Sequence, residues 1–85
     1  MDTQTLDAAL ALAAQAGSVR EAASALRTQR APLRVMVVDA QDLRDEPPAA
    51  SDARHHLYLG ASDGHCWAIT HDPAQAAGLF IAARS

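Results

Sequence analysis

Two alternating runs on either side of a turn sequence constrain the folding of this chain more than any other feature. Before the turn, leucines alternate with other residues over 57–60, and after it Trp67 and Ile69 alternate with smaller side chains. Between the runs lies Ser62-Asp63-Gly64, whose residue types favour a tight reversal of the chain. The sequence therefore predicts a β-hairpin over residues 55–71.

The length of the hairpin loop decides which side chains share a face. A three-residue loop at 62–64, with its glycine in the left-handed conformation, places Leu59 opposite Trp67 and Leu57 opposite Ile69. A two-residue loop would instead send the indole ring to the face away from both leucines, because one step of register exchanges the faces. We therefore predict the three-residue loop, with both leucines and the tryptophan in the core.

The first third of the chain predicts two helices. Residues 4–16 are rich in alanine and leucine at helical spacing, and Gly17 is placed to end that helix. Ser18 and Glu21 then have the spacing of a capping box, in which each side chain accepts a hydrogen bond from the other residue's amide. A second helix is expected from Val19 to about Gln29.

The remaining segments are expected to be strands and loops. The β-branched residues within 34–39 favour a strand, although Pro32 and a helical spacing leave a helix as the alternative at Leu33, Met36, Val37, Ala40 and Leu43. Residues 41–54 are acidic and contain two prolines, which is typical of a surface loop. Residues 79–82 predict a last strand, with one helix over 73–83 as the alternative.

These elements predict a single α+β domain over residues 1–85. In this architecture, two N-terminal helices pack on one face of a small antiparallel sheet of three or four strands that contains the 55–71 hairpin. A domain of this size has room for one core and a shallow site. We expect neither a cofactor nor catalysis.

The sequence favours a cytoplasmic protein without a membrane segment. Cys66 is the only cysteine, so no disulfide can form within the chain, which fits a reducing compartment. No stretch reaches the roughly 20 apolar residues that span a bilayer. The N-terminus also lacks the basic start of a secretory signal.

Residues 17–26 resemble the first half of a Fis-type helix-turn-helix, in which a glycine-led segment enters an alanine-rich helix. Arg30 and Leu33 fall near the offsets of the second helix of that motif. The resemblance implies a DNA-binding or regulatory module, with phosphate contacts from Arg20, Arg27, Arg30 and Arg34. The chain departs from the pattern at Arg27, where glycine is usual, and at Pro32, which interrupts the next helix.

Charge disfavours nucleic acid as the main partner. Residues 1–34 hold four arginines against three acids, and residues 35–85 hold three arginines against seven acids. The formal net charge is therefore −3, whereas nucleic-acid binders concentrate positive charge on one face. DNA binding stays an alternative.

Histidines at the open end of the hairpin give a second alternative. In the three-residue register His55 lies opposite His71, and two opposed imidazoles can share a metal ion. Two ligands make a weak site, and no zinc-binding spacing is present. A metal-binding or thiol-dependent function would centre on His55, His71 and Cys66, although Cys66 is better interpreted as a structural thiol.

The sheet face away from the helices gives the preferred functional prediction. If the helices cover the leucine face, the other face is open, mildly apolar and surrounded by polar residues, which is typical of a protein-interaction surface. We therefore predict a non-catalytic module that either binds a protein partner or associates with itself as a homodimer. The residues expected at this surface are Met36, Val38, Tyr58, Cys66 and Ala68.

Overall fold

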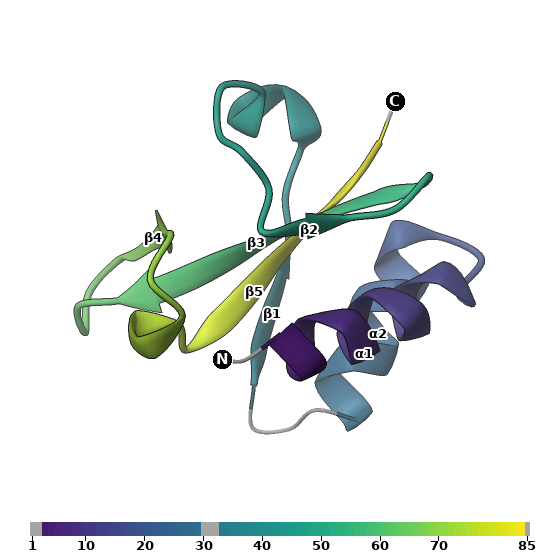
Figure 1. Cartoon of the computed structure of the whole chain (residues 1–85), viewed down its shortest axis with the longest axis horizontal. Helices are drawn as coiled ribbons and strands as arrows, with labels where there is room; N and C mark the ends of the chain where they lie inside the picture. Colours follow the sequence, from purple (N-terminus) through teal and green to yellow (C-terminus); the bar gives the residue numbers. More distant parts are fainter. Residues whose placement is uncertain (1–2, 30–32, 85) are drawn as a thin grey trace.

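The computed structural model describes residues 3–29 and 33–84 (Figure 1). Two helices, α1 (Thr3–Ala14) and α2 (Val19–Gln29), precede a sheet of five strands. The predicted α+β class and the N-terminal position of the helices are confirmed. None of the helices in the described ranges is long and apolar enough to cross a membrane.

The start of α2 uses the predicted capping residues in a shifted arrangement. The amide of Glu21 donates to Ser18 Oγ at 3.1 Å, as in a capping box. The Glu21 carboxylate, however, accepts from the amide of Gly17 at 2.9 Å, one residue before the expected donor. Both bonds satisfy amides at the helix start that have no partner within the helix.

The strands form a mixed sheet in the order β1-β5-β3-β2, and β4 also pairs with β3. Their bounds are β1 (Arg34–Val37), β2 (Ala50–Ser51), β3 (His55–Ser62), β4 (Trp67–Thr70) and β5 (Gly78–Ala83). The segments at 34–37 and 78–83 are thus strands and not helices. The β1–β5 pair is parallel and the other pairs are antiparallel, so the prediction of a purely antiparallel sheet is corrected at this one pair.

One face of the sheet packs against both helices and forms the core. Val35, Leu79 and Leu59 lie side by side in register, and Ile81 and Leu57 form the next row on the same face. All five are buried. The helices contribute mostly small side chains, which let their backbones approach the sheet closely: Ala9, Ala13, Ala22, Ala23 and Leu26 are all fully buried.

The predicted hairpin forms, but its register differs from the expected one. Ser62 pairs with Trp67 and Leu59 pairs with Thr70, so the loop spans 63–66. Asp63 Oδ1 accepts from the amides of the third and fourth loop residues at 2.8 and 2.9 Å, which holds both outside the strand. Gly64 has the expected positive φ, at 97°. Because of this register, the prediction that Trp67 shares a face with Leu57 and Leu59 is wrong.

Trp67 instead lies on the second face of the sheet, above two glycines. Gly60 and Gly78 are partners across β3 and β5 and present no side chain there. A Cβ at Gly60 would lie 3.3 Å from Trp67 Cε3, and one at Gly78 would lie 3.1 Å from Trp67 Cζ3. The indole ring therefore rests on the flat surface that these glycines leave.

The connection between β1 and β2 covers another part of this second face. It leads from one end of the strand order to the other and includes the short 3-10 helix η1 (Ala40–Leu43), on the side of the sheet away from α1 and α2 (Figure 1). Its residues line a hollow together with His56 and Tyr58. Tyr58 is only 3% exposed as a result, so this part of the second face is not open as the sequence predicts.

The chain enters β5 through a second 3-10 helix, η2 (Pro73–Gln75). Asp72 begins it, because its carboxylate accepts from the amide of Ala74 at 3.0 Å and Pro73 follows at the first helical position. The chain then joins β5 at Gly78, where the amide just before it donates to the carbonyl of Gly60 at 2.8 Å.

Candidate functional site

The predicted partner-binding residues do not form one surface. Met36 and Tyr58 lie on the second face, and Val38 follows β1 with its amide donating to the carbonyl of Ile81 at 2.9 Å. Tyr58 is buried there. Ala68 pairs with Ala61 and so belongs to the opposite face. Cys66 lies in the exposed hairpin loop, outside β4.

The predicted histidine pair is also separated. His55 is buried at the start of β3 and pairs with Ala83, whereas His71 is exposed beyond the end of β4. The Nε2 atom of His71 lies 3.4 Å from a carboxylate oxygen of Glu46. Within residues 3–29 and 33–84, no three histidine, cysteine or acidic side chains lie close enough to hold a metal ion.

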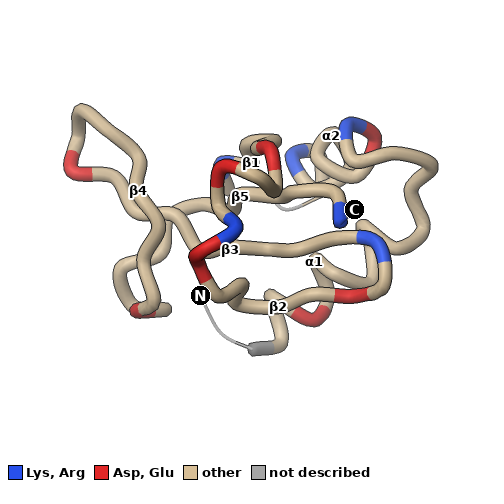
Figure 2. Tube along the Cα trace, turned by 90° about the horizontal axis from the view of Figure 1, so that it is seen from above, with Lys and Arg blue, Asp and Glu red and all other residues tan. Residues whose placement is uncertain are grey.

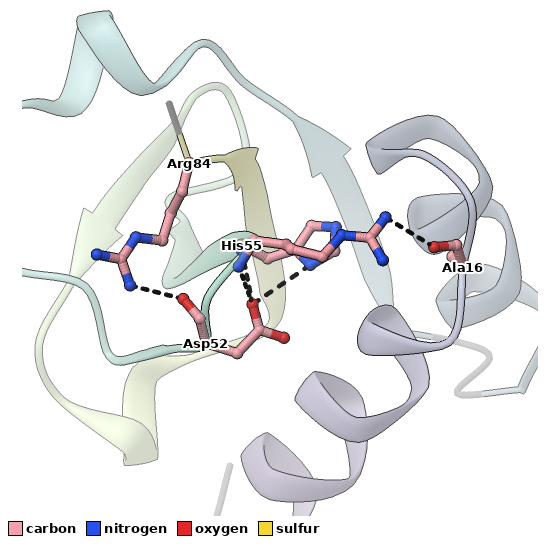
Figure 3. Close-up of polar contacts among 5 residues, drawn as sticks. Ala16, Asp52, His55 and Arg84 are labelled. Carbon is pink, nitrogen blue, oxygen red and sulfur yellow. Dashed lines mark hydrogen bonds and ion pairs between the residues drawn. The ribbon is translucent and has the colours of Figure 1, made fainter.

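A cluster of polar contacts surrounds Asp52 in the turn between β2 and β3 (Figure 3). Asp52 Oδ1 accepts from the amides of Arg54 and His55, both at 2.7 Å, and its backbone carbonyl accepts from Arg84 Nη1 at 2.7 Å. Arg54 Nη2 reaches the carbonyl of Ala16 beyond α1, at 3.1 Å. These bonds tie the turn to the end of β5 and to α1, which is a structural role.

The electrostatics of this cluster are governed by backbone amides. Partial burial raises the pKa of Asp52, but the amides of Arg54 and His55 and the nearby His55 ring together lower it below its ordinary value of 3.8. The Nδ1 atom of His55 lies 3.5 Å from Asp52 Oδ1, within ion-pair range but without hydrogen-bond geometry. This contact therefore orients the ring only weakly.

A hollow of about 360 Å³ separates the β1–β2 connection from the second face. His56 and Tyr58 form its floor, with ring centroids 6.3 Å apart, and Arg44 and Glu46 contribute opposite charges from the connection. The Nδ1 atom of His56 is buried without a hydrogen-bond partner. Because Arg44 and Glu46 carry opposite charges, the lining of this hollow does not favour a ligand of either sign.

The arginines expected to bind nucleic acid meet at a different place, the free side of β1. Arg20 and Arg27 project from α2, Arg34 begins β1, and Arg30 lies outside the described residues. The tube view shows basic residues towards both ends of α2 (Figure 2). Among the described residues no recognition helix follows α2, because the chain forms β1 where the resemblance to a helix-turn-helix requires that helix.

Two adjoining hollows run along this side of β1, and we call them together the β1 edge groove. The larger, of about 600 Å³, lies between α2 and β1 and is lined by Arg20, Ser24, Arg27, Met36 and Val37. The smaller, of about 320 Å³, is lined by Arg27, Leu33, Arg34, Val35, Met36 and Trp67. Arg27 and Met36 belong to both hollows.

β1 is a terminal strand, and no other strand within residues 3–29 and 33–84 covers its outer edge. The carbonyl of Val35 accepts from Arg27 Nε at 2.9 Å, whereas the amide of Val38 points inward to β5. Because peptide groups alternate in direction along a strand, the amide and carbonyl of Val37 point outward with those of Val35. The Val37 side chain is also 41% exposed, the one large apolar side chain in the described residues that is left exposed.

The β1 edge groove therefore offers outward backbone groups, apolar side chains and arginines. Its only hydroxyl belongs to Ser24, and no histidine, aspartate or glutamate lines either hollow among the residues that the structure describes. Without a general base, this serine has no means of activation as a nucleophile. These features suit the groove to binding.

Comparison with protein-family models, with curated proteins and with solved structures found no match to this chain.

The sequence analysis identifies Met36 and the arginines of the β1 edge groove as binding residues, but it does not identify Val37 and Trp67. The signal for Trp67 is the pair Gly60 and Gly78, which leave room for a large ring on one face. Val37 gives no such signal, because its exposure depends on β1 lying at the end of the sheet.

Proposed function

We propose that this protein is a non-catalytic, cytoplasmic interaction module that binds an extended segment of a partner protein along the β1 edge groove. The outer edge of β1 supports this proposal most directly, because it leaves the peptide groups of Val37 and the Val37 side chain without a neighbouring strand. An unpaired edge is a template for another strand, whose backbone supplies affinity while side-chain hollows supply specificity.

The hollows beside β1 fit this mode of binding. An added strand projects alternate side chains to the two sides of the sheet. On the helix side these would meet Val37 and the hollow between α2 and β1, and on the other side they would meet Met36 and Trp67. Both sets of side chains of a bound segment would thus have a place to pack.

Charge favours a different protein over a second copy of this chain. Two antiparallel copies of β1 related by a two-fold axis would bring the grooves of the two copies together. The arginines of one groove, Arg20 and Arg27, would then lie near the same arginines of the other copy, and like charges at an interface are unfavourable. We therefore expect a monomer that binds a foreign segment.

Nucleic acid remains the second candidate, because the same arginines could contact phosphates. The net charge of the chain, however, is −3, which disfavours a long polyanion. The exposed Val37 side chain and the outward carbonyl groups of β1 would also gain nothing from a phosphate backbone, which offers no donors to them. Both features favour a protein segment.

A library of displayed random peptides selected on the full chain tests the proposal. Selected peptides should shift the amide resonances of β1 and α2 more than those of other elements. The Val37→Pro variant should lose this binding, because proline removes the outward amide, and such a change is tolerated at an edge. Val37→Thr is the matched control, because it keeps the amide and the β-branched shape. Selected peptides that shift only other elements would refute the proposal.

A further inference from the structure

The β1 edge groove carries charge of one sign. Arg20, Arg27 and Arg34 line its two hollows, and no acidic side chain lines either of them in the part of the chain that is described. The acidic residues gather elsewhere, notably along the β1–β2 connection (Figure 2). The groove is thus a basic surface on a chain whose net charge is negative. Such a surface attracts a negatively charged partner.

Arg27 occupies a position that an added strand needs. Its Nε atom donates to the carbonyl of Val35 at 2.9 Å, in a partly buried contact. This carbonyl points away from β5, so an amide of an added strand would have to bond there. Addition of a strand therefore requires the guanidinium to move, and the added strand would then cover part of the exposed Arg27 side chain, so that its donors need an acceptor on that strand.

A carboxylate is the acceptor that compensates this move best. A hydrogen bond between a guanidinium and a carboxylate is shorter and stronger than one to a neutral carbonyl, and it can be bidentate. Resting on the proposed function, we infer that the partner is an extended acidic segment of another protein. A carboxylate of this segment takes the Arg27 guanidinium while its backbone amide bonds to the Val35 carbonyl.

The geometry of a strand sets the pattern of the segment. Arg20 and Arg27 both project from α2, on the helix side of β1, so the carboxylates that meet them must lie at alternate positions. Arg34 lies on the opposite side of β1, where it lines the smaller hollow together with Trp67. A further acidic side chain of the segment can pair with Arg34 on that side. The segment is therefore an alternation of acidic and apolar residues, flanked by another acid.

Synthetic peptides test this inference on the full chain. Trp67 is the only tryptophan and lines the groove, so its fluorescence reports binding of a peptide that contains none. A peptide alternating glutamate with valine should bind about tenfold more tightly than a peptide of equal length alternating lysine with valine. Methylation of the glutamate peptide's amides along one edge should weaken its binding by about tenfold, because those amides bond to β1.

Two arginine variants separate charge recognition from folding. Arg27→Gln should lower the preference for glutamate over lysine by about threefold. It should bind an uncharged threonine–valine peptide at least as well as the wild type, because the Val35 carbonyl is then less obstructed. Arg44→Gln, an exposed arginine on the connection, is the control and should leave the preference unchanged. If Arg27→Gln does not fold, Arg20→Gln tests the charge preference at the other arginine of the larger hollow.

Four outcomes would overturn the inference, and they differ in what they leave standing. Equal binding of the glutamate and lysine peptides at β1 removes the acidic partner but keeps the proposed function. Binding of neither these nor library peptides at β1 removes both. If a single-stranded oligothymidylate binds more tightly than the glutamate peptide and shifts the same β1 amide resonances, the groove is assigned to nucleic acid. A sedimentation mass for the isolated chain that doubles with concentration, and that Val37→Pro abolishes, assigns it to a second copy.

Discussion

Gly60 and Gly78 determine the position of Trp67 at the scale of single residues. They face each other across β3 and β5, and the indole ring lies over both. Had either position carried a side chain, the ring could not occupy the second face in this way. The two positions differ in what a side chain would meet, because Phe80 and Trp67 surround Gly60, whereas backbone lies against Gly78.

We expect Gly78→Ala to destabilise the protein by about 2 kcal/mol, a typical result of overpacking. Its Cβ would lie 2.7 Å from the backbone oxygen of Arg34, which cannot move without disturbing β1. Gly60→Ala should have a smaller effect, because its nearest neighbour is a side-chain atom of Phe80 at 3.0 Å. Urea unfolding monitored by Trp67 fluorescence measures both. Equal losses in the two variants would contradict this assignment.

Asp52 gives the stability of the protein a dependence on pH. Burial raises the pKa of this carboxyl. The two backbone amides and His55 together lower the pKa by more than burial raises it, so the pKa in the folded state lies below 3.8. A carboxyl with a depressed pKa stabilises the fold above its unfolded value, and this contribution is lost as pH falls through the folded value. The side chain is 23% exposed, so solvent screens part of the effect.

We therefore expect Asp52→Asn to lower the free energy of unfolding by about 1 kcal/mol at pH 6, since its amide oxygen accepts the same bonds more weakly. The difference from the wild type should shrink as the pH falls below 3.8. Urea unfolding at several pH values measures it. The control Asp45→Asn removes an exposed charge from the connection. A difference between wild type and Asp52→Asn that grows towards acid would contradict the direction of this pKa shift.

At the scale of elements, the sequence predicted the helices and strands well and the pairing of the hairpin poorly. Alanine periodicity and the residues around Gly17 suffice to locate both helices, because these signals are local. The strand at 34–37 follows from β-branched residues in the same way. The hairpin register depends on Asp63, which accepts two amides and lengthens the loop by one residue compared with the expected one. Several such loops are compatible with the same residue types.

Asp63→Ala should loosen β4 without disturbing the helices. The amides of His65 and Cys66 would lose their acceptor, and the loss of stability should be small because the turn is exposed and water can replace the carboxylate. The fluorescence maximum of Trp67 should move to longer wavelength, while helical circular dichroism stays unchanged. Asp63→Asn keeps an acceptor oxygen and should resemble the wild type. Loss of the helical circular dichroism signal in Asp63→Ala would show that β4 cannot loosen without unfolding of the helices.

At the scale of the whole molecule, the sequence could not supply the order of the strands. Placing β1 beside β5 joins segments more than 40 residues apart in the chain, and their parallel pairing leaves no local trace in composition. The candidate groove exists only because of that order, which puts Val37 at an outer edge beside α2. The connection over Tyr58 is likewise a consequence of β1 and β2 lying at opposite ends of the order. The sequence therefore identifies residues such as Met36 and Arg27 as candidates for binding, but it does not predict that both line the β1 edge groove.

The same order predicts how amide hydrogen exchange varies across the sheet. β5 lies between β1 and β3, and its residues Leu79 and Ile81 are fully buried, so its amides should exchange slowest. β4 pairs with β3 alone and is half-exposed, so it should exchange faster. Within the β1 segment, the outward amide of Val37 should exchange much faster than that of Val38, which bonds to Ile81. Equal protection of these two neighbouring amides would mean that the outer edge of β1 is covered, and the groove would then be unavailable for an added strand.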